Sequence, residues 1–257
     1  MQWEFFTFLA VGFLAQLVDG ALGMAYGLVS STVLLAFGVP PAQVSASVHA
    51  AELFTTAASG ASHAWHRNVD FKLLGQLVPT GIVGGALGAF VLTSIPGDAI
   101  KPFVLVYLAG VGVLLLFRTF RPFPTKPVPG RIVVPLGGVG GFLDAVGGGG
   151  WGPVVTSTLI GAGGQPRYVI GTVNAAEFLV TLAISASFVI ALLTGHWEEA
   201  GEIMDHAAAV GGLIAGGIVS APLAGMSVKL IPTRPMTGLV GALVAATTIY
   251  QAVRMLS

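Results

Sequence analysis

Eight long apolar segments restrict this chain to folds that a lipid bilayer can hold. The segments cover residues 4–37, 41–66, 71–95, 99–118, 132–162, 167–194, 207–229 and 235–255. A helix needs about 20 apolar residues to cross a hydrocarbon core of ~30 Å. Only 9% of the residues are charged, whereas ordinary soluble domains carry about 25%. The sequence therefore predicts an all-α polytopic membrane protein.

Charge and cysteine content exclude several classes of function. The net charge is zero, so we expect no nucleic-acid partner. The chain contains no cysteine, which excludes disulfides, zinc sites with cysteine ligands and thiol catalysis. Neither a G-x-x-x-x-G-K-[ST] nor an H-E-x-x-H motif is present, and we expect no cofactor and no bound metal.

The two halves of the chain are copies of one another. A shift of 125 residues places Asp19 on Asp144 and Glu52 on Glu177, with 12 identities in 34 ungapped positions. A composition this biased gives roughly three or four identities by chance. We therefore predict a first transmembrane repeat over residues 1–118 and a second over residues 132–257. A proline-rich, basic linker over residues 119–131 joins them, and we expect it to be cytoplasmic.

The first apolar segment of each repeat is predicted to be broken. Residues 4–37 would form a helix of about 50 Å, which is longer than a bilayer core. The segment contains Asp19-Gly20 near its middle, and its copy contains four consecutive glycines, Gly147 to Gly150. Because glycine disfavours helix, we expect two half-length helices joined by irregular backbone.

The distribution of basic residues favours re-entrant first segments and inverted repeats. If each first segment returns to the side it came from, Lys101 and Arg254 lie on one face and nine basic residues share the other. These nine are Arg67, Lys72, Arg118, Arg121, Lys126, Arg131, Arg167, Lys229 and Arg234. Cytoplasmic loops are enriched in basic residues, so both termini are predicted to lie outside. The same reasoning puts an acidic loop outside, formed by Glu198, Glu199, Glu202 and Asp205.

Two recurring motifs carry a family resemblance. The first half contains Asp19-Gly20-x-x-Gly23-x-x-x-Gly27, then Pro41 and His49-Ala50-Ala51-Glu52. The second contains Asp144, Gly148-x-x-x-Gly152, Pro166 and Asn174-Ala175-Ala176-Glu177. The whole chain resembles the TauE/SafE family of membrane transporters. This resemblance implies a protein of the bacterial inner membrane that moves sulfite, sulfoacetate or related organosulfur compounds.

A polar stripe marks the second segment of each repeat. Its residues are spaced 4, 3, 4, 3 and 4 apart, which places them on one helix face; they are Ser45, His49, Glu52, Thr56, Ser59 and His63. Ionisable groups inside a bilayer normally face a cavity or a partner. We interpret Asp19, Glu52, Asp144 and Glu177 as proton-coupling residues, or alternatively as braces that hold the fold. For the two aspartates, the alternative is to cap the half-helices.

The broken segments predict a binding site for an anion. A helix that restarts inside the bilayer presents free N–H groups and the positive end of its dipole. The candidate substrate-binding residues are Gly23, Gly27, Ser31, His49, Gly148, Gly149, Gly152, Thr156 and Asn174. The alternative for the glycines is close helix packing. Packing is the role we expect for Gly84-x-x-x-Gly88 and Gly212-x-x-x-Gly216.

These features together predict a secondary transporter of small anions that is coupled to protons. The resemblance alone implies that the substrate contains sulfur. The expected partners are this anion and the lipid bilayer, and a homodimer is a possible assembly. Two alternatives stay open: an intramembrane enzyme that uses a metal or a serine, and a cation channel lined by Glu52 and Glu177.

Overall fold

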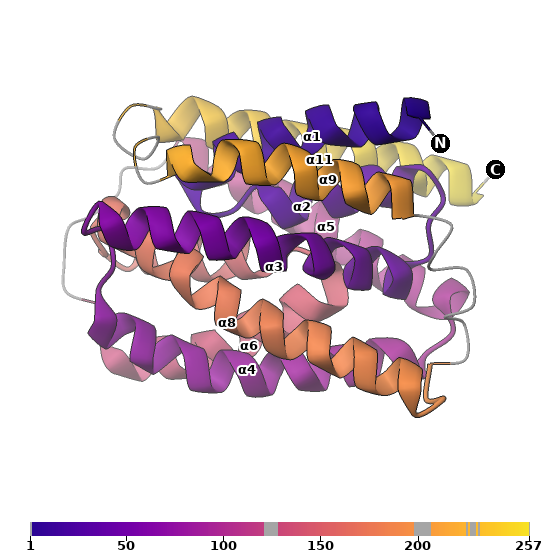
Figure 1. Ribbon diagram of the computed structural model, residues 1–257, viewed down its shortest axis with the longest axis horizontal. Coiled ribbons are helices and arrows are strands. Elements are labelled where there is room, and N and C mark those ends of the chain that lie inside the picture. The colour runs from indigo at the N-terminus through magenta and orange to yellow at the C-terminus, as the bar shows by residue number, and fades with distance from the viewer. Residues whose placement is uncertain are drawn as a thin grey trace.

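The protein is a bundle of helices that lie nearly side by side (Figure 1). The computed structural model describes residues 2–120, 128–197, 207–224, 226, 230 and 232–256, and this part contains helices and no strand. The α-helices are α1 (Gln2–Leu22), α2 (Tyr26–Ala36), α3 (Pro41–Trp65), α4 (Phe71–Ser94), α5 (Gly97–Thr119), α6 (Gly130–Gly147), α7 (Ser157–Gly161), α8 (Pro166–Leu193), α9 (Ala207–Ser220) and α11 (Thr233–Leu256). The π-helical turn η1 (Gly152–Thr156) precedes α7, and the 3-10 turn η3 (Ala221–Leu223) follows α9.

The helices confirm the predicted all-α membrane architecture. Five helices of the described part are long and apolar enough to cross a membrane, namely α1, α4, α5, α8 and α11. Within the third segment of the second repeat, α9 ends at Ser220 and the turn η3, which contains Pro222, follows it. The predicted acidic loop and the linker residues 121–127 lie outside the described residues.

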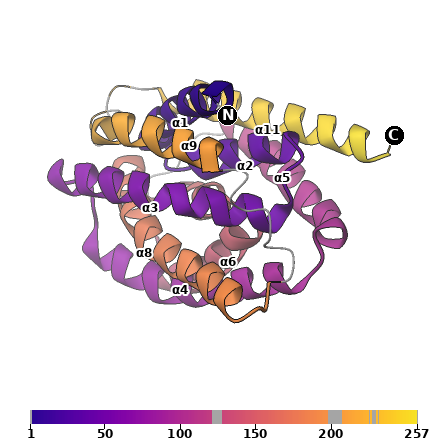
Figure 2. The same ribbon diagram turned by 45° about the vertical axis from the view of Figure 1, so that its right-hand side comes forward.

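The helix α3 lies in the centre of the bundle, and its polar stripe is buried there. All six stripe residues are buried. Because they are polar, they lower the mean hydropathy of α3, and this explains why α3 is absent from the five apolar spans. In both ribbon views α3 lies between a group formed by α1, α9 and α11 and a group formed by α4, α6 and α8 (Figures 1 and 2). The polar side chains are therefore enclosed by protein and kept away from lipid.

The two halves of the chain are interwoven. The most extensive helix contacts pair α1 with α9, α4 with α6, α5 with α11 and α3 with α8, so each pair joins one helix from each half. The pattern is reciprocal, because the first segment of either half packs against the third segment of the other. Residues far apart in the sequence thus form one common core.

The helices α3 and α8, which occupy equivalent places in the two repeats, run antiparallel. The His49 ring lies 6.3 Å from the Phe188 ring, whereas Ser59 donates a hydrogen bond to Asn174 at 2.7 Å. Later residues of α3 therefore meet earlier residues of α8. Inverted repeats require this arrangement, while their orientation across a bilayer remains a prediction.

Basic residues gather at one end of the bundle. At this end Arg167 donates to Asn68 at 2.6 Å, and the end also holds Arg67, Lys72, Arg118, Arg131 and Arg234. At the opposite end, Lys101 and Arg254 line a hollow beside Gly38. The remaining basic residues, Arg121, Lys126 and Lys229, lie outside the described residues.

Candidate functional site

Both first segments are broken, and each break is built on a glycine. Gly23 follows α1 with a φ of +63°, and Gly148 follows α6 with a φ of +65°. This left-handed conformation costs glycine little and strains residues that carry a Cβ. The breaks come later than expected, because Asp19 and Asp144 are still helical and the chain leaves the helix only at the left-handed glycines.

The two aspartates hold the helices that restart after the breaks. Asp19 Oδ1 accepts the N–H groups of Ala25 at 2.8 Å and Tyr26 at 3.3 Å. In the other half, Asp144 Oδ1 accepts the N–H of Trp151 at 2.9 Å. A carboxylate at a helix start satisfies N–H groups that have no partner within the helix. The expected anion sites are thus already occupied by carboxylates of the chain itself.

Two hydroxyl groups tie the breaks together across the halves. Ser31 donates to the carbonyl of Gly148, and the equivalent Thr156 donates to the carbonyl of Gly23 at 2.8 Å. Each hydroxyl satisfies the carbonyl of the left-handed glycine in the opposite half. That these hydroxyls contact a substrate stays a prediction.

The glycines near the breaks lie against backbone and a carboxyl rather than against open space. A methyl group at Gly27 would collide with Glu52 Oε1 and would lie 2.8 Å from the Cα of Gly149. At Gly152 it would collide with the backbone of Gly23 and Met24. In this closed arrangement Gly27, Gly149 and Gly152 therefore serve close packing. They allow the two breaks, called the tips below, to approach each other more closely than side chains would permit.

His49 connects α3 to the break in the second half. Its Nε2 lies 3.3 Å from Asp144 Oδ2 and 3.9 Å from Glu52 Oε2, and its Nδ1 lies 2.7 Å from the carbonyl of Ser45. The side chains of His49, Glu52 and Asp144 are at most 1% exposed. Within the described residues, neither carboxyl oxygen of Glu52 has a hydrogen-bond partner.

The equivalent position in the second half is occupied by an amide. Asn174 accepts a hydrogen bond from Ser59 at 2.7 Å and donates to the carbonyl of Ile170 at 3.3 Å. Glu177 is buried one turn further along α8 and interacts electrostatically with Asp19 and Glu52. The structure thus brings together all four carboxyl groups that the sequence singled out.

Tyr107 is a member of the site that sequence reasoning missed. Its hydroxyl, on α5, is buried beside Gly150 and has no hydrogen-bond partner among the described residues. Its ring packs against Gly147. No local pattern marks Tyr107, because α5 is an ordinary apolar span whose contact with the break arises only in the folded protein.

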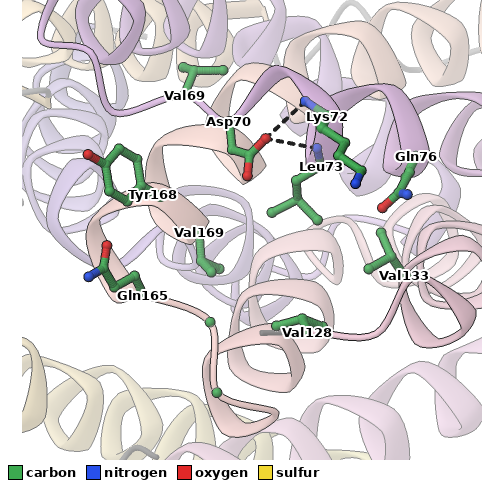
Figure 3. Close-up of a pocket in the computed structure, with 13 residues that line it drawn as sticks. Val69, Asp70, Lys72, Leu73, Gln76, Val128, Val133, Gln165, Tyr168 and Val169 are labelled. Carbon is green, nitrogen blue, oxygen red and sulfur yellow. Dashed lines mark hydrogen bonds between the residues drawn. The ribbon is translucent and has the colours of Figure 1, made fainter. Parts of the chain in front are cut away.

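Two hollows lie at the ends of the bundle, and the carboxyl cluster lies between them. At the basic end a hollow of about 760 Å³ includes Asp70, Lys72, Gln76, Gln165 and Tyr168 among its lining residues. Figure 3 shows Asp70 accepting the N–H groups of Lys72 and Leu73 at the start of α4. The hollow at the other end measures about 260 Å³. Because the cluster itself is buried, it is closed to both ends in this structure.

The cluster consists mainly of buried carboxyl groups. In the described part of the chain, no group of three or more histidine and acidic side chains is arranged to hold a metal ion. A buried carboxyl group without a cation partner is costly unless it is neutralised by a proton. The cluster is therefore a candidate site for binding protons, and its hydrogen-bonding groups are candidates for contact with a small polar ligand.

Comparisons with known proteins agree with this architecture. The sequence profile of the family described as "Sulfite exporter TauE/SafE" matches residues 8–251. The "Probable membrane transporter protein YtnM" of Bacillus subtilis (strain 168) is 43% identical over 245 residues, covering 93% of this chain and 79% of the relative. No solved structure gives a significant match. The chain therefore belongs to the TauE/SafE sulfite exporter family and is a multi-pass transporter of the plasma membrane rather than an enzyme.

Proposed function

We propose that this transporter moves small sulfur oxyanions, such as sulfite or sulfoacetate, and that protons accompany them. The observation that carries the proposal is the buried cluster of Asp19, Glu52, Asp144, Glu177 and His49 at the meeting point of two broken helices. Broken helices that meet within the bilayer form the binding sites of many secondary transporters. The family described as a sulfite exporter supports the substrate class.

The substrate site that we propose lies beside the start of α2. Asp19 Oδ1 accepts two N–H groups there, and Asp19 Oδ2 is buried without a partner among the described residues. An oxyanion that binds these N–H groups takes the place of the Asp19 carboxylate. A proton taken up by the same cluster offsets the negative charge that the anion adds, so the anion and the proton are loaded together. Asn174, whose side-chain nitrogen lies close to Gly23, supplies a further donor.

The hollow at the basic end is the approach route that we propose for the anion. Its lining contains Asp70 and Lys72, and the same end of the bundle also holds Arg67, Arg131 and Arg167, whereas Lys101 lies at the opposite end. A positive charge in a cleft raises the local concentration of anions. Opening of the bundle toward one end at a time would then expose the central site alternately to the two sides of the membrane.

Transport in proteoliposomes tests the proposal. Sulfoacetate is a suitable probe because a sulfonate keeps its charge throughout the neutral pH range, whereas sulfite gains a proton there. With the membrane potential clamped at zero, an imposed pH gradient should drive accumulation of sulfoacetate or sulfite above the level in protein-free vesicles. Failure of a pH gradient to drive either anion, together with a linear current carried by cations, would instead identify a channel lined by Glu52 and Glu177.

Substitution of the glutamates tests their part in the coupling. Glu52→Gln and Glu177→Gln remove a titratable proton and keep the side-chain volume, so the pH dependence of anion uptake should flatten while the protein stays folded. Glu4→Gln is a matched control, because Glu4 lies at the exposed start of α1. A wild-type pH response in both buried variants would make these residues braces of the fold.

A further inference from the structure

The two repeats differ at the position where the carboxyl cluster meets the polar stripe. Asp19 matches Asp144 and Glu52 matches Glu177, but His49 of the first repeat matches Asn174 of the second. Both repeats therefore keep the acidic groups, but the first has a titratable histidine where the second has an amide that does not titrate. This difference is informative because the two helices otherwise hold equivalent places in the fold.

The contacts of His49 require it to share a second proton with Asp144. Nδ1 lies 2.7 Å from the Ser45 carbonyl, which only accepts hydrogen bonds. The Ser45 hydroxyl, 3.2 Å from Nδ1, donates its hydrogen to the Ala145 carbonyl, so Nδ1 itself carries a hydrogen. Nε2 faces Asp144 Oδ2 at 3.3 Å. A hydrogen bond between these two atoms needs one more proton, held either by the imidazole or by the carboxyl.

The contacts of Asn174 leave no place for such a proton. Its carbonyl oxygen accepts from Ser59 at 2.7 Å, and its nitrogen donates to the Ile170 carbonyl at 3.3 Å. An amide keeps its hydrogens at every physiological pH. Asn174 can therefore bind a polar ligand and hold α8 against α3, but it cannot load or release a proton.

We propose that the pair of His49 and Asp144 holds the proton that this transporter carries, and that the equivalent position at Asn174 serves binding only. The inference rests on the proposed function, since it names the proton carrier of that same site. Loading forms an N–H bond between a proton from water and the lone pair of His49 Nε2. Unloading breaks this bond and returns the proton to water on the other side of the membrane, so the imidazole is neutral again.

Several ionisable groups face the pair from the surrounding helices. On α3 itself Glu52 lies 3.9 Å from His49, and on α5 the Tyr107 hydroxyl interacts electrostatically with Asp144. On α1 and α8, respectively, Asp19 and Glu177 interact electrostatically with Glu52, as does Tyr26 on α2. The two tyrosine hydroxyls are neutral, whereas each carboxyl group that is ionised stabilises a positive imidazolium next to Asp144.

The direct test replaces His49 by the residue of the other repeat. Exchange of labelled for unlabelled sulfoacetate across vesicles without a pH gradient is measured first, because it shows whether His49→Asn is folded and still moves the anion. Accumulation driven by a pH gradient should be lost, leaving equal concentrations on both sides. His66→Asn is the matched control, since His66 ends α3 at the basic end and takes no part in the cluster; it should behave as the wild type.

The outcomes separate this inference from the proposed function. If the wild type shows no accumulation driven by a pH gradient, the proposed function itself fails. If the wild type accumulates the anion and His49→Asn does so equally well, the function stands and the assignment of the proton to His49 is overturned.

A measurement on the unaltered protein covers the case in which His49→Asn does not fold. Nitrogen NMR of the wild type labelled at histidine should show one buried imidazole that changes from doubly to singly protonated over the pH range in which uptake changes. The four other histidines are assigned by single substitutions. A His49 that stays singly protonated over this whole range would contradict the proposal.

Discussion

At the scale of single residues, the site depends on reciprocal hydrogen bonds between the two breaks. Ser31 and Thr156 occupy equivalent positions, and each donates to the carbonyl of the glycine that ends the helix in the opposite half. A buried carbonyl that loses its donor has no water to replace it. The two hydroxyls therefore hold the tips together in the closed state.

Removal of either hydroxyl should loosen the tips. We expect Ser31→Ala and Thr156→Val each to lower the free energy of unfolding in detergent by about 1–3 kcal/mol, because each leaves one buried carbonyl unpaired. The measurement is a thermal unfolding curve. Ser30→Ala is the control, since the buried Ser30 hydroxyl has no partner among the described residues. Equal effects of all three substitutions would show that the reciprocal bonds contribute nothing specific.

At the scale of helices, glycine allows close packing between the halves. The expected packing role of the pairs in α4 and α9 is confirmed: a methyl group at Gly88 would lie 2.6 Å from the Phe142 carbonyl, and one at Gly212 would lie 2.9 Å from the Leu9 nitrogen. The packing is reciprocal here too. A methyl group at Gly81 would lie 2.8 Å from the Trp151 ring, and one at Gly217 would lie 3.0 Å from the equivalent Tyr26 ring.

Glycines in the helices should tolerate substitution by alanine only where the space beside them is open. A methyl group at Gly84 would collide with the carbonyl of Gly138 on α6, so Gly84→Ala should destabilise the protein by about 1–3 kcal/mol. Gly110 on α5 is exposed and has no atom within 4 Å of an added methyl group. Gly110→Ala should leave stability unchanged or raise it by up to ~1 kcal/mol. The opposite order of the two unfolding temperatures would contradict this account of the α4 and α6 contact.

At the scale of the whole molecule, the two repeats form one bundle. The predicted division into residues 1–118 and 132–257 describes the duplication, but the main helix pairs all cross between the halves. Large apolar side chains such as Phe103, Val106 and Leu193 are at least 70% exposed on the outside of the bundle, where a lipid bilayer would cover them. The homodimer stays a prediction.

The orientation of the bundle can be measured with single cysteines, because the chain has none of its own. Asp98 lies at the end that carries Lys101, and Arg131 lies at the basic end; both are exposed. If the basic end is cytoplasmic, an impermeant maleimide should label Asp98→Cys in intact cells and Arg131→Cys only after the cells are opened. Labelling of Arg131→Cys alone in intact cells would reverse the orientation, and labelling of both would contradict a single crossing of the membrane by α5.

The positions of the helices could be predicted from the sequence because they depend on local properties. Apolar length fixes where a segment can cross a bilayer, so α4, α5 and α8 begin and end within about two residues of the predicted spans. The breaks were also predictable, since glycine and the duplicated aspartates mark them. Their location was less certain: a helix continues past Asp19 and ends only where Gly23 adopts a left-handed conformation.

The sequence by itself determined the membrane class, the duplication and the inventory of buried ionisable groups, because each follows from composition or from comparison of the chain with itself. Only the tertiary structure decided how these groups are used. The contact of His49 with Asp144 joins residues 95 positions apart, and that of Ser31 with Gly148 joins residues 117 apart. Local patterns place a side chain on a helix face, but they do not say which helix that face meets. That choice is made when the two halves pack into each other, and it places Ser31, Thr156 and the glycines of the breaks in the contacts that close the site.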